Sequence, residues 1–168
     1  MTLSMYQACV PVLLHGLTAF EAILDKAAAH AEAKKIDPSV FIQARLAPDM
    51  FPFARQLQIA TDMAKGGVAR LAGVDPVRME DTETTFDELK ARLAKTREII
   101  GGFTVAQIDG SEDRDIVLQA GPNTLNFKGQ PYLMLFVLPN FYFHLTAAYA
   151  ILRHNGVELS KRDFLGGI

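Results

Sequence analysis

The sequence predicts an all-α protein, a four-helix bundle with a short β-hairpin inserted before the last helix. Four segments carry apolar residues at alternating three- and four-residue steps, which places those residues on one face of a helix. A Gly-Pro-Asn-Thr turn separates two short apolar runs, a pattern typical of a β-hairpin. The last helical segment, residues 131–153, is apolar nearly all round, as expected for a helix in the centre of a bundle.

Length and composition indicate one globular domain. The chain has 168 residues, 49% of them hydrophobic and 21% charged, so we expect residues 1–168 to form a single helical-bundle domain. The 17 basic and 19 acidic side chains give a formal net charge of -2, which provides no basic excess for binding nucleic acid. The single cysteine, Cys9, excludes an internal disulfide and fits a reducing compartment, so we expect a cytoplasmic protein.

Two apolar stretches resemble membrane segments. Residues 1–17 lack the basic start and the small-residue cleavage site of a signal peptide. Residues 129–152 contain no Asp, Glu, Lys or Arg and are long enough to span a bilayer. However, this stretch contains Gln130, Asn140 and His144, whose polar groups need partners inside a membrane. We therefore expect a buried bundle helix and no membrane association, and the membrane span is the alternative.

The first helix is expected from Leu3 to about Lys34. Pro11 lies inside the pattern and predicts a kink or a late start of the helix. A short helical turn over residues 38–45 follows the break at residues 34–38. The apolar stripe of the first helix consists of Tyr6, Val10, Leu13, Leu17, Phe20 and Leu24.

The second helix is expected from about Pro52, a favoured first-turn residue, to Leu71, with Gly73 at its end. The loop before it, residues 47–52, carries two prolines. The Gly66-Gly67 pair lowers the intrinsic helix propensity of this segment, and close approach by another helix or another chain would explain it.

The third helix is expected over residues 86–100, after an acidic loop at residues 79–84. Thr85 and Glu88 have the spacing of a capping box at its start. Residues 115–128 predict the hairpin, with residues 121–124 as its turn. The fourth helix ends at Asn155-Gly156, because glycine readily takes the left-handed conformation that ends a helix.

His144 is the most informative of the four histidines. No two histidines lie three to five residues apart, so no helix offers a paired metal-binding face. His144 is predicted to point inward, with Asn140 one turn before it on the same face. A buried imidazole without a partner costs about 1–3 kcal/mol, so we expect a hydrogen bond. A core residue and a polar binding pocket both fit, with partners from the set Gln56, Asp62, Tyr142 and Tyr149.

The other reactive side chains indicate no site. His15 is displaced from the main stripe of the first helix, and His30 and His154 are expected to be solvated. Cys9 has no basic neighbour in the sequence and is interpreted as a small hydrophobe. The tail, residues 160–166, is expected to pack back on the bundle or on a partner.

Four stretches together resemble a bacterial family of unknown function in the DinB/YfiT-like superfamily of metalloenzymes. They are Arg-Leu-Ala-Pro-Asp-Met-Phe-Pro at 45–52, Pro-Asn-Phe-Tyr-Phe-His at 139–144, Ala-Tyr-Ala-Ile-Leu-Arg-His-Asn-Gly at 148–156 and Lys-Arg-Asp-Phe-Leu-Gly at 161–166. The resemblance covers essentially the whole chain. It implies a DinB-like four-helix bundle, commonly dimeric, and a three-histidine site for a divalent metal, used in some relatives for thiol-dependent group transfer.

The sequence departs from the family pattern at this metal site. The relatives use one histidine from an earlier helix and an HxxxH pair on a later one. Here His144 matches the first member of the pair, but the fourth residue on is Ala148, and no histidine lies between His30 and His144. A Zn²⁺ or Ni²⁺ site would have to recruit Asp49, Gln56 or Asp62. We therefore expect no metal or other cofactor, with zinc or nickel as the alternative.

Three functions remain open at this point, and the sequence does not decide whether the chain is an enzyme. The first is a metal-free bundle that binds a small molecule or acts through its surface as a homodimer. The second is a divalent-metal or thiol-dependent transferase or hydrolase, with His144 as general base or ligand. The third is a structural interaction protein. The dimer prediction rests on Gly66-Gly67, Phe51 and Phe53, and the candidate ligand pocket consists of His144, Asn140, Gln56, Tyr149 and Asp49.

Overall fold

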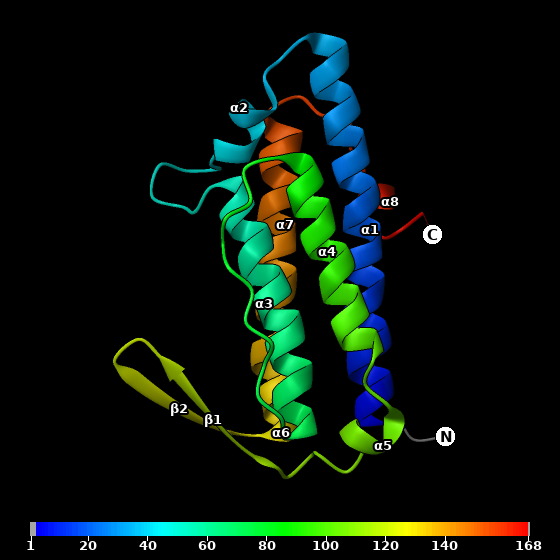
Figure 1. Cartoon of the computed structure of the whole chain (residues 1–168), viewed down its shortest axis with the longest axis vertical. Coiled ribbons are helices and arrows are strands. Elements are labelled where there is room, and N and C mark those ends of the chain that lie inside the picture. Colours follow the sequence, from blue (N-terminus) through cyan, green and yellow to red (C-terminus); the bar gives the residue numbers. More distant parts are fainter. Residues whose placement is uncertain (1–2, 168) are drawn as a thin grey trace.

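Four long helices form the bundle in the computed structural model, which describes residues 3–167 (Figure 1). They are α1 (Met5–Lys34), α3 (Phe53–Ala72), α4 (Phe86–Gly101) and α7 (Leu138–His154). The other elements are α2 (Pro38–Gln43), α5 (Val105–Ile108), β1 (Asp115–Ala120), β2 (Asn123–Lys128), α6 (Gly129–Pro131), the π-helical segment η1 (Tyr132–Val137) and α8 (Lys161–Phe164). The predicted fold, an all-α four-helix bundle with a short β-hairpin inserted before the last helix, is confirmed.

Local capping signals set the starts of two long helices. At α4 the Thr85 hydroxyl accepts from the Glu88 N–H, and the Glu88 carboxylate accepts from the Thr85 N–H, so the predicted capping box is confirmed. Ser4 and Gln7 form the same arrangement at α1. Because α1 already begins at Met5, Pro11 does not delay its start, and the predicted late start is wrong.

The hairpin projects sideways from one end of the bundle (Figure 1). Its strands pair from Asp115↔Lys128 to Ala120↔Asn123, which leaves a turn of two residues, shorter than the predicted four. Gly121 has a φ of 60°, which the first central position of a II′ turn requires. Phe127 of β2 packs on two rings of η1, so the base of the hairpin is anchored to the bundle; the centroid distances are 5.6 Å to Tyr132 and 5.2 Å to Phe136.

The predicted fourth helix contains a π-helical segment before α7. The Leu138 N–H bonds to the carbonyl of Leu133, five residues back. Pro139 follows, and a proline in a regular helix clashes with the carbonyl four residues back, which here belongs to Leu135. The wider π turn gives the proline ring room, so the helical run continues from Gly129 to His154.

Two helical runs are long and apolar enough to span a membrane by length and composition: α1 and Gly129–His154. A buried core helix passes the same test, so this observation is weak evidence by itself. The share of the window buried inside the bundle is 50% for α1 and 39% for Gly129–His154. The second run therefore leaves much of its apolar surface outside the core.

Two glycines allow close approach between helices of this chain. A Cβ on Gly67 would lie 2.6 Å from Cγ1 of Val137, so the π segment packs directly on the α3 backbone. A Cβ on Gly16 would lie 2.8 Å from Cε1 of Phe141. Gly67 of α3 therefore allows close approach by another helix of the same chain, which is one of the two explanations that the sequence suggested.

This packing removes most of the grounds for the dimer prediction. Gly66 and Gly67 are buried in the single chain, and Phe53 is fully buried in the core. Of the residues on which the dimer prediction rested, only Phe51 lies at the surface, with 53% of its area exposed. A dimer therefore needs other surface residues than those the sequence suggested.

Candidate functional site

His144 on α7 and Gln56 on α3 form a hydrogen-bonded pair between two neighbouring helices. Nδ1 of His144 lies 2.7 Å from Oε1 of Gln56, and the Gln56 Nε2 donates to the Phe51 carbonyl at 3.0 Å. Gln56 is 1% exposed, and these two hydrogen bonds hold both ends of its side-chain amide in place. An amide oxygen only accepts, so Nδ1 of His144 carries the proton and Nε2 keeps its lone pair.

The surroundings keep this imidazole neutral. Burial lowers the pKa of His144 below its ordinary value of 6.5, and the positive charge of Arg55 lowers the pKa further. His144 is half-buried, so part of the residue remains accessible to solvent. A neutral imidazole with a free Nε2 can accept a proton or a hydrogen bond at pH 7.

The structure brings together only two of the five predicted pocket residues. Asn140 donates from its side-chain amide to the Phe136 carbonyl at 2.6 Å, so it stabilises the turn between η1 and α7. Tyr149 packs edge-on against Phe164 of α8, at a centroid distance of 5.7 Å. Asp49 is exposed in the loop before α3. Among the predicted partners of His144, the one found is Gln56.

The residues present do not fit the three-histidine metal site that the family resemblance implies. Within residues 3–167, no group of three or more His, Cys, Asp and Glu side chains is placed to hold a metal ion. Gln56 occupies Nδ1 of His144, and Asp62 is bonded to Arg92 and Lys65. Burial raises the pKa of the Cys9 thiol to about 12, which agrees with the interpretation of Cys9 as a small hydrophobe.

The tail packs back on the bundle of its own chain. Asp163 of α8 forms an ion pair with Lys26 of α1 at 2.6 Å, and Nε2 of His15 lies 3.1 Å from the Leu165 carbonyl oxygen. The hydrogen bond from Lys26, together with the Ser160 N–H, lowers the pKa of Asp163 to about 2. His30, expected to be solvated, is half-buried against the edge of Phe41, because α2 folds over that end of α1.

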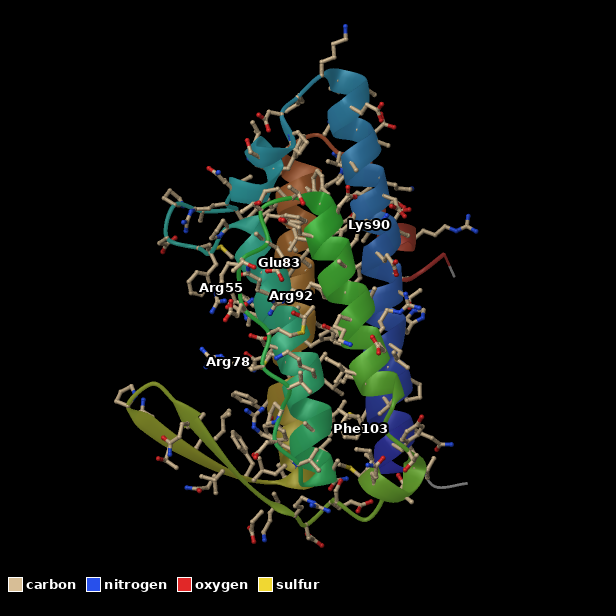
Figure 2. All side chains as sticks on the ribbon, in the orientation of Figure 1. Arg55, Arg78, Glu83, Lys90, Arg92 and Phe103 are labelled. Atoms are coloured by element: carbon tan, nitrogen blue, oxygen red, sulfur yellow. The ribbon has the colours of Figure 1, made fainter. Side chains whose placement is uncertain are left out.

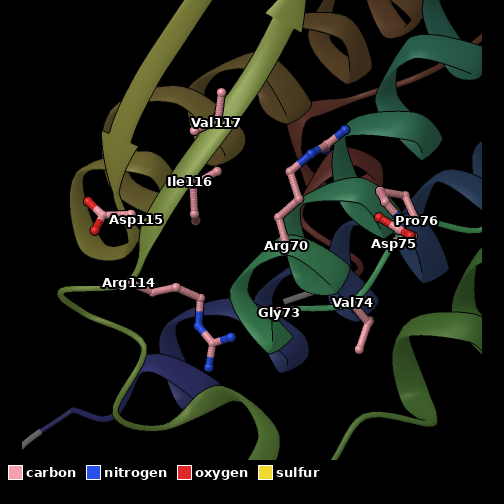
Figure 3. Close-up of a pocket in the computed structure, with 9 residues that line it drawn as sticks. All are labelled: Arg70, Gly73, Val74, Asp75, Pro76, Arg114, Asp115, Ile116 and Val117. Atoms are coloured by element: carbon pink, nitrogen blue, oxygen red, sulfur yellow. The ribbon is translucent and has the colours of Figure 1, made fainter.

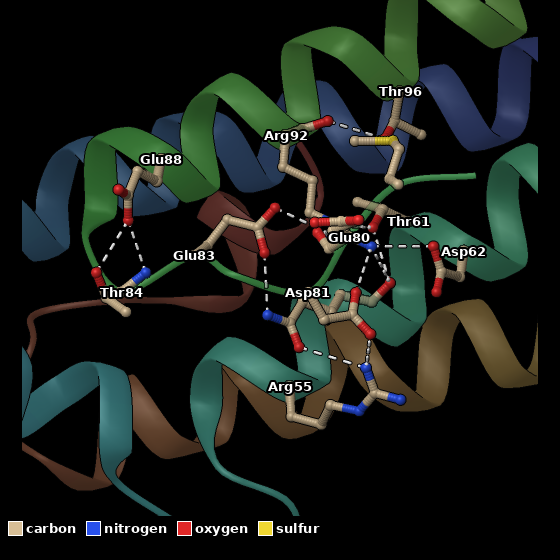
Figure 4. Close-up of polar contacts among 12 residues, drawn as sticks. Arg55, Thr61, Asp62, Glu80, Asp81, Glu83, Thr84, Glu88, Arg92 and Thr96 are labelled. Atoms are coloured by element: carbon tan, nitrogen blue, oxygen red, sulfur yellow. Dashed lines mark hydrogen bonds and ion pairs between the residues drawn. The ribbon is translucent and has the colours of Figure 1, made fainter. Parts of the chain in front are cut away.

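A buried arginine at the centre of an ionic network is the main feature that the sequence analysis missed (Figure 4). Arg92 on α4 is 2% exposed. Its guanidinium joins α3, α4 and the loop between them. It donates from Nε to Thr61 at 2.7 Å, from Nη1 to the Glu80 carbonyl and Glu83 at 2.9 Å each, and from Nη2 to Asp62 at 3.0 Å. Nη2 also forms an ion pair with Asp81 at 3.0 Å.

Neighbouring cations complete the charge balance of this network. Lys65 pairs with Asp62 at 2.8 Å, and Arg55 pairs with Asp81. With Arg92, three positive groups face three carboxylates, so the charges cancel around the buried guanidinium. The network fixes the acidic loop along α3, as the side-chain view also shows (Figure 2).

A sequence signal for this network existed. Leu89, Leu93 and Thr96 recur at helical spacing within the predicted third helix, and Arg92 lies three residues after Leu89 and four before Thr96. A charged residue on an apolar stripe predicts a buried ion when acidic partners are available. The acidic loop at residues 79–84 supplied such partners.

The largest surface hollows described lie away from His144. A groove of about 380 Å³ runs between the end of α3 and β1 (Figure 3). Another hollow of about 390 Å³ lies beside Arg45 and Glu83. Neither is lined by His144 or Gln56.

Comparison with known proteins identifies the family. Residues 5–165 match the family model described as Domain of unknown function (DUF1993). The chain belongs to the DUF1993 family. The DUF1993 chain is also similar to the crystal structure of a DinB family member protein from Shewanella denitrificans, determined at 1.83 Å. The two are 40% identical, the match covers 97% of this chain and 92% of that one, and the TM-score is 0.87. A comparison with curated proteins finds no match.

The predicted resemblance to a DinB-like family is thereby confirmed. The stretch at residues 139–144, on which the resemblance partly rested, includes both the proline after the π turn and His144. Membership in the DUF1993 family gives the fold and leaves the activity open, because one fold hosts many functions.

Proposed function

We propose that this DUF1993 protein is a cytoplasmic, metal-free interaction protein that self-associates through the outer face of α7 and η1. The single observation that supports this proposal is the exposure of large apolar side chains on that face. Leu135 is 75% exposed, Phe143 59% and Met134 48%. Residues 129–152 contain no charged side chain.

An apolar surface of this kind is unusual on a monomer. Contiguous exposed apolar side chains mark interaction sites, because their burial against a partner removes apolar area from water. Homodimer interfaces are depleted of charge at their centre. A second copy presents the same uncharged face, so two-fold packing leaves no charge without a partner.

Leu135→Lys is expected to convert the dimer into a monomer, because it places a charge at the most exposed apolar position of the face. Sedimentation equilibrium at micromolar concentration measures the mass of both forms. The control is Val40→Lys, which changes a 53% exposed valine on α2 and is expected to leave the dimer intact.

Two outcomes would contradict self-association. One is a monomeric mass for the unmodified chain at tens of micromolar. The other is binding of the chain to lipid vesicles in a flotation assay that Leu135→Lys abolishes while the chain in solution stays monomeric. The second outcome would assign the same face to a membrane.

A second candidate function is proton transfer on a small molecule at His144. The observation that favours it is the fixed protonation of the ring: Gln56 accepts from Nδ1 and leaves Nε2 free to act as a base. This role also requires no metal ion. It predicts that folding favours the neutral form of the His144 imidazole over the protonated form.

His144→Gln is therefore expected to flatten the pH dependence of stability below about pH 6.5. The pKa of His144 is lower in the folded state than its ordinary value of 6.5. The unfolded chain thus binds more protons below pH 6.5, so the free energy of unfolding falls as the pH drops through 6.5 toward the folded pKa. The stability that the neutral His144 contributes is fully present above pH 6.5. Urea denaturation at several pH values measures the slope.

The matched control is His154→Gln, which removes an exposed histidine from the same helix and should preserve the slope. An unchanged slope in His144→Gln would contradict the neutral imidazole and with it this second candidate function.

A further inference from the structure

We propose that the groove between β1 and the end of α3 binds an extended acidic peptide segment of another protein, which adds as a third strand to the hairpin. This site lies on a different surface from the outer face of α7. The groove has a volume of about 380 Å³. Its lining consists of Arg70, the segment 73–76 and the segment 114–117 (Figure 3).

The pattern of lining residues shows that the groove faces the edge of β1. Asp115, Ile116 and Val117 are consecutive, and successive side chains of a strand point to opposite faces of a sheet. A groove that contacts all three meets the strand from its side. The sheet has only the two strands β1 and β2, so the outer edge of β1 has no neighbouring strand among the described residues.

The register identifies which backbone groups point into the groove. A two-residue turn makes the residues beside it, 120 and 123, a hydrogen-bonded pair, and the pair types alternate from there. Asp115, Val117 and Gln119 then fall in pairs that are not hydrogen-bonded. Their N–H and C=O groups point outward, where an extended chain can pair with them.

Two arginines give the groove its preference for acidic residues. Arg70 makes one hydrogen bond, to the Tyr132 hydroxyl at 3.2 Å. The Arg114 guanidinium lies over Gly73, where a Cβ would be 1.8 Å from Nη1. Within residues 3–167 neither arginine forms an ion pair, and each retains free donors for a carboxylate.

The acidic residues of the groove leave it with a net positive charge. Asp115 already pairs with Lys128 at 2.7 Å, so its charge is balanced outside the groove. The remaining charged residues of the lining are one acidic side chain, Asp75, and the two arginines. Figure 3 shows the guanidinium groups of Arg70 and Arg114 directed away from each other. A single small anion would meet one of them, whereas an extended segment carries side chains along the whole groove.

The bound segment comes from another protein, because two of the acidic side chains of this chain's own loop at residues 79–84 are already paired with Arg92. Glu83 and Asp81 of that loop are bonded to Arg92, and Gln58 donates to Glu83 at 3.0 Å. A second copy would therefore have to break its buried ionic network to supply the segment.

The test uses a fluorescent, end-blocked octapeptide of alternating Glu and Val, titrated with the full chain and followed by anisotropy. Val117→Pro removes one outward N–H of β1 and leaves the bonds to β2 intact, so it is expected to weaken binding at least about tenfold. The matched control is Asn126→Pro, which changes the residue opposite Val117 and blocks the outer edge of β2. It is expected to leave binding unchanged.

Arg114→Gln tests the charge and is also expected to weaken binding about tenfold. Its control is Arg153→Gln, which changes an exposed arginine near the end of α7. If Val117→Pro does not fold, as seen by circular dichroism, Arg114→Gln still decides the question. Leu135→Lys should bind the peptide normally, which separates this site from self-association.

Several results would overturn the proposal. They are no saturable binding to the unmodified chain at millimolar peptide, equal losses in the two proline variants, and equal binding of a peptide with Lys in place of Glu. Competition by glutamate or inorganic phosphate at the same molar concentration as the peptide would instead indicate a small-anion site.

Discussion

Replacing Arg92 with methionine is expected to lower the free energy of unfolding by about 3–5 kcal/mol, because it leaves the mostly buried carboxylate of Glu83 without a cation and removes one of the two cations that contact each of Asp62 and Asp81. The guanidinium is 2% exposed and bonds to Asp62, Asp81 and Glu83. Methionine fills a similar volume, so the loss reports the ionic contacts rather than a cavity. Urea denaturation followed by circular dichroism measures the change.

Arg97→Met is the matched control on the same helix. Arg97 pairs with Glu21 alone, and its side chain is 37% exposed. Surface ion pairs of this kind contribute roughly 0–1 kcal/mol, so this variant should remain close to the unmodified chain. Similar losses in both variants would show that the buried network contributes no more than a surface ion pair.

Replacing Phe141 with alanine is expected to cost about 3–5 kcal/mol, the usual range for removing a buried aromatic ring. Phe141 is fully buried, and its ring edge lies against the backbone at Gly16. Gly16 has no side chain that could fill the space left by the ring. Thermal or urea denaturation measures the loss.

Phe143→Ala is the control, with the same substitution two residues along the same helix. Phe143 is 59% exposed, so its loss should change the stability of the monomer by no more than about 0.5 kcal/mol. The comparison is made at a concentration low enough to keep the chain monomeric, because Phe143 belongs to the proposed interface. Equal losses would mean that the two faces of α7 are buried to the same extent.

The features that the sequence predicted correctly depend on neighbouring residues. The capping box of Thr85 and Glu88, the helix end at Gly73 and the paired strands of the hairpin all arise from contacts over a few positions. The apolar stripes at helical spacing then gave the four helices and the bundle. Local contacts can be read from spacing because the geometry of a helix or a turn fixes which neighbours meet.

The apolar composition of the last helix hid the difference between its two faces. Phe141 and Phe143 look alike in the sequence, and one is fully buried while the other is 59% exposed. A helix with apolar residues all round gives no periodic signal to separate its buried side from its outer side. The same ambiguity concealed the π turn, which depends on Pro139 and on the packing of Val137 against Gly67.

The sequence by itself determined the helical elements, the hairpin, the DinB-like family and the absence of the histidine spacing that the metal site of its relatives uses. Tertiary structure decided which residues meet. It placed Gln56 against His144 across 88 positions and Arg92 against three carboxylates of α3 and the acidic loop. It also left the outer face of α7 exposed. Such pairings follow from how helices pack and cross, and the spacing within one helix carries no information about the register of the next.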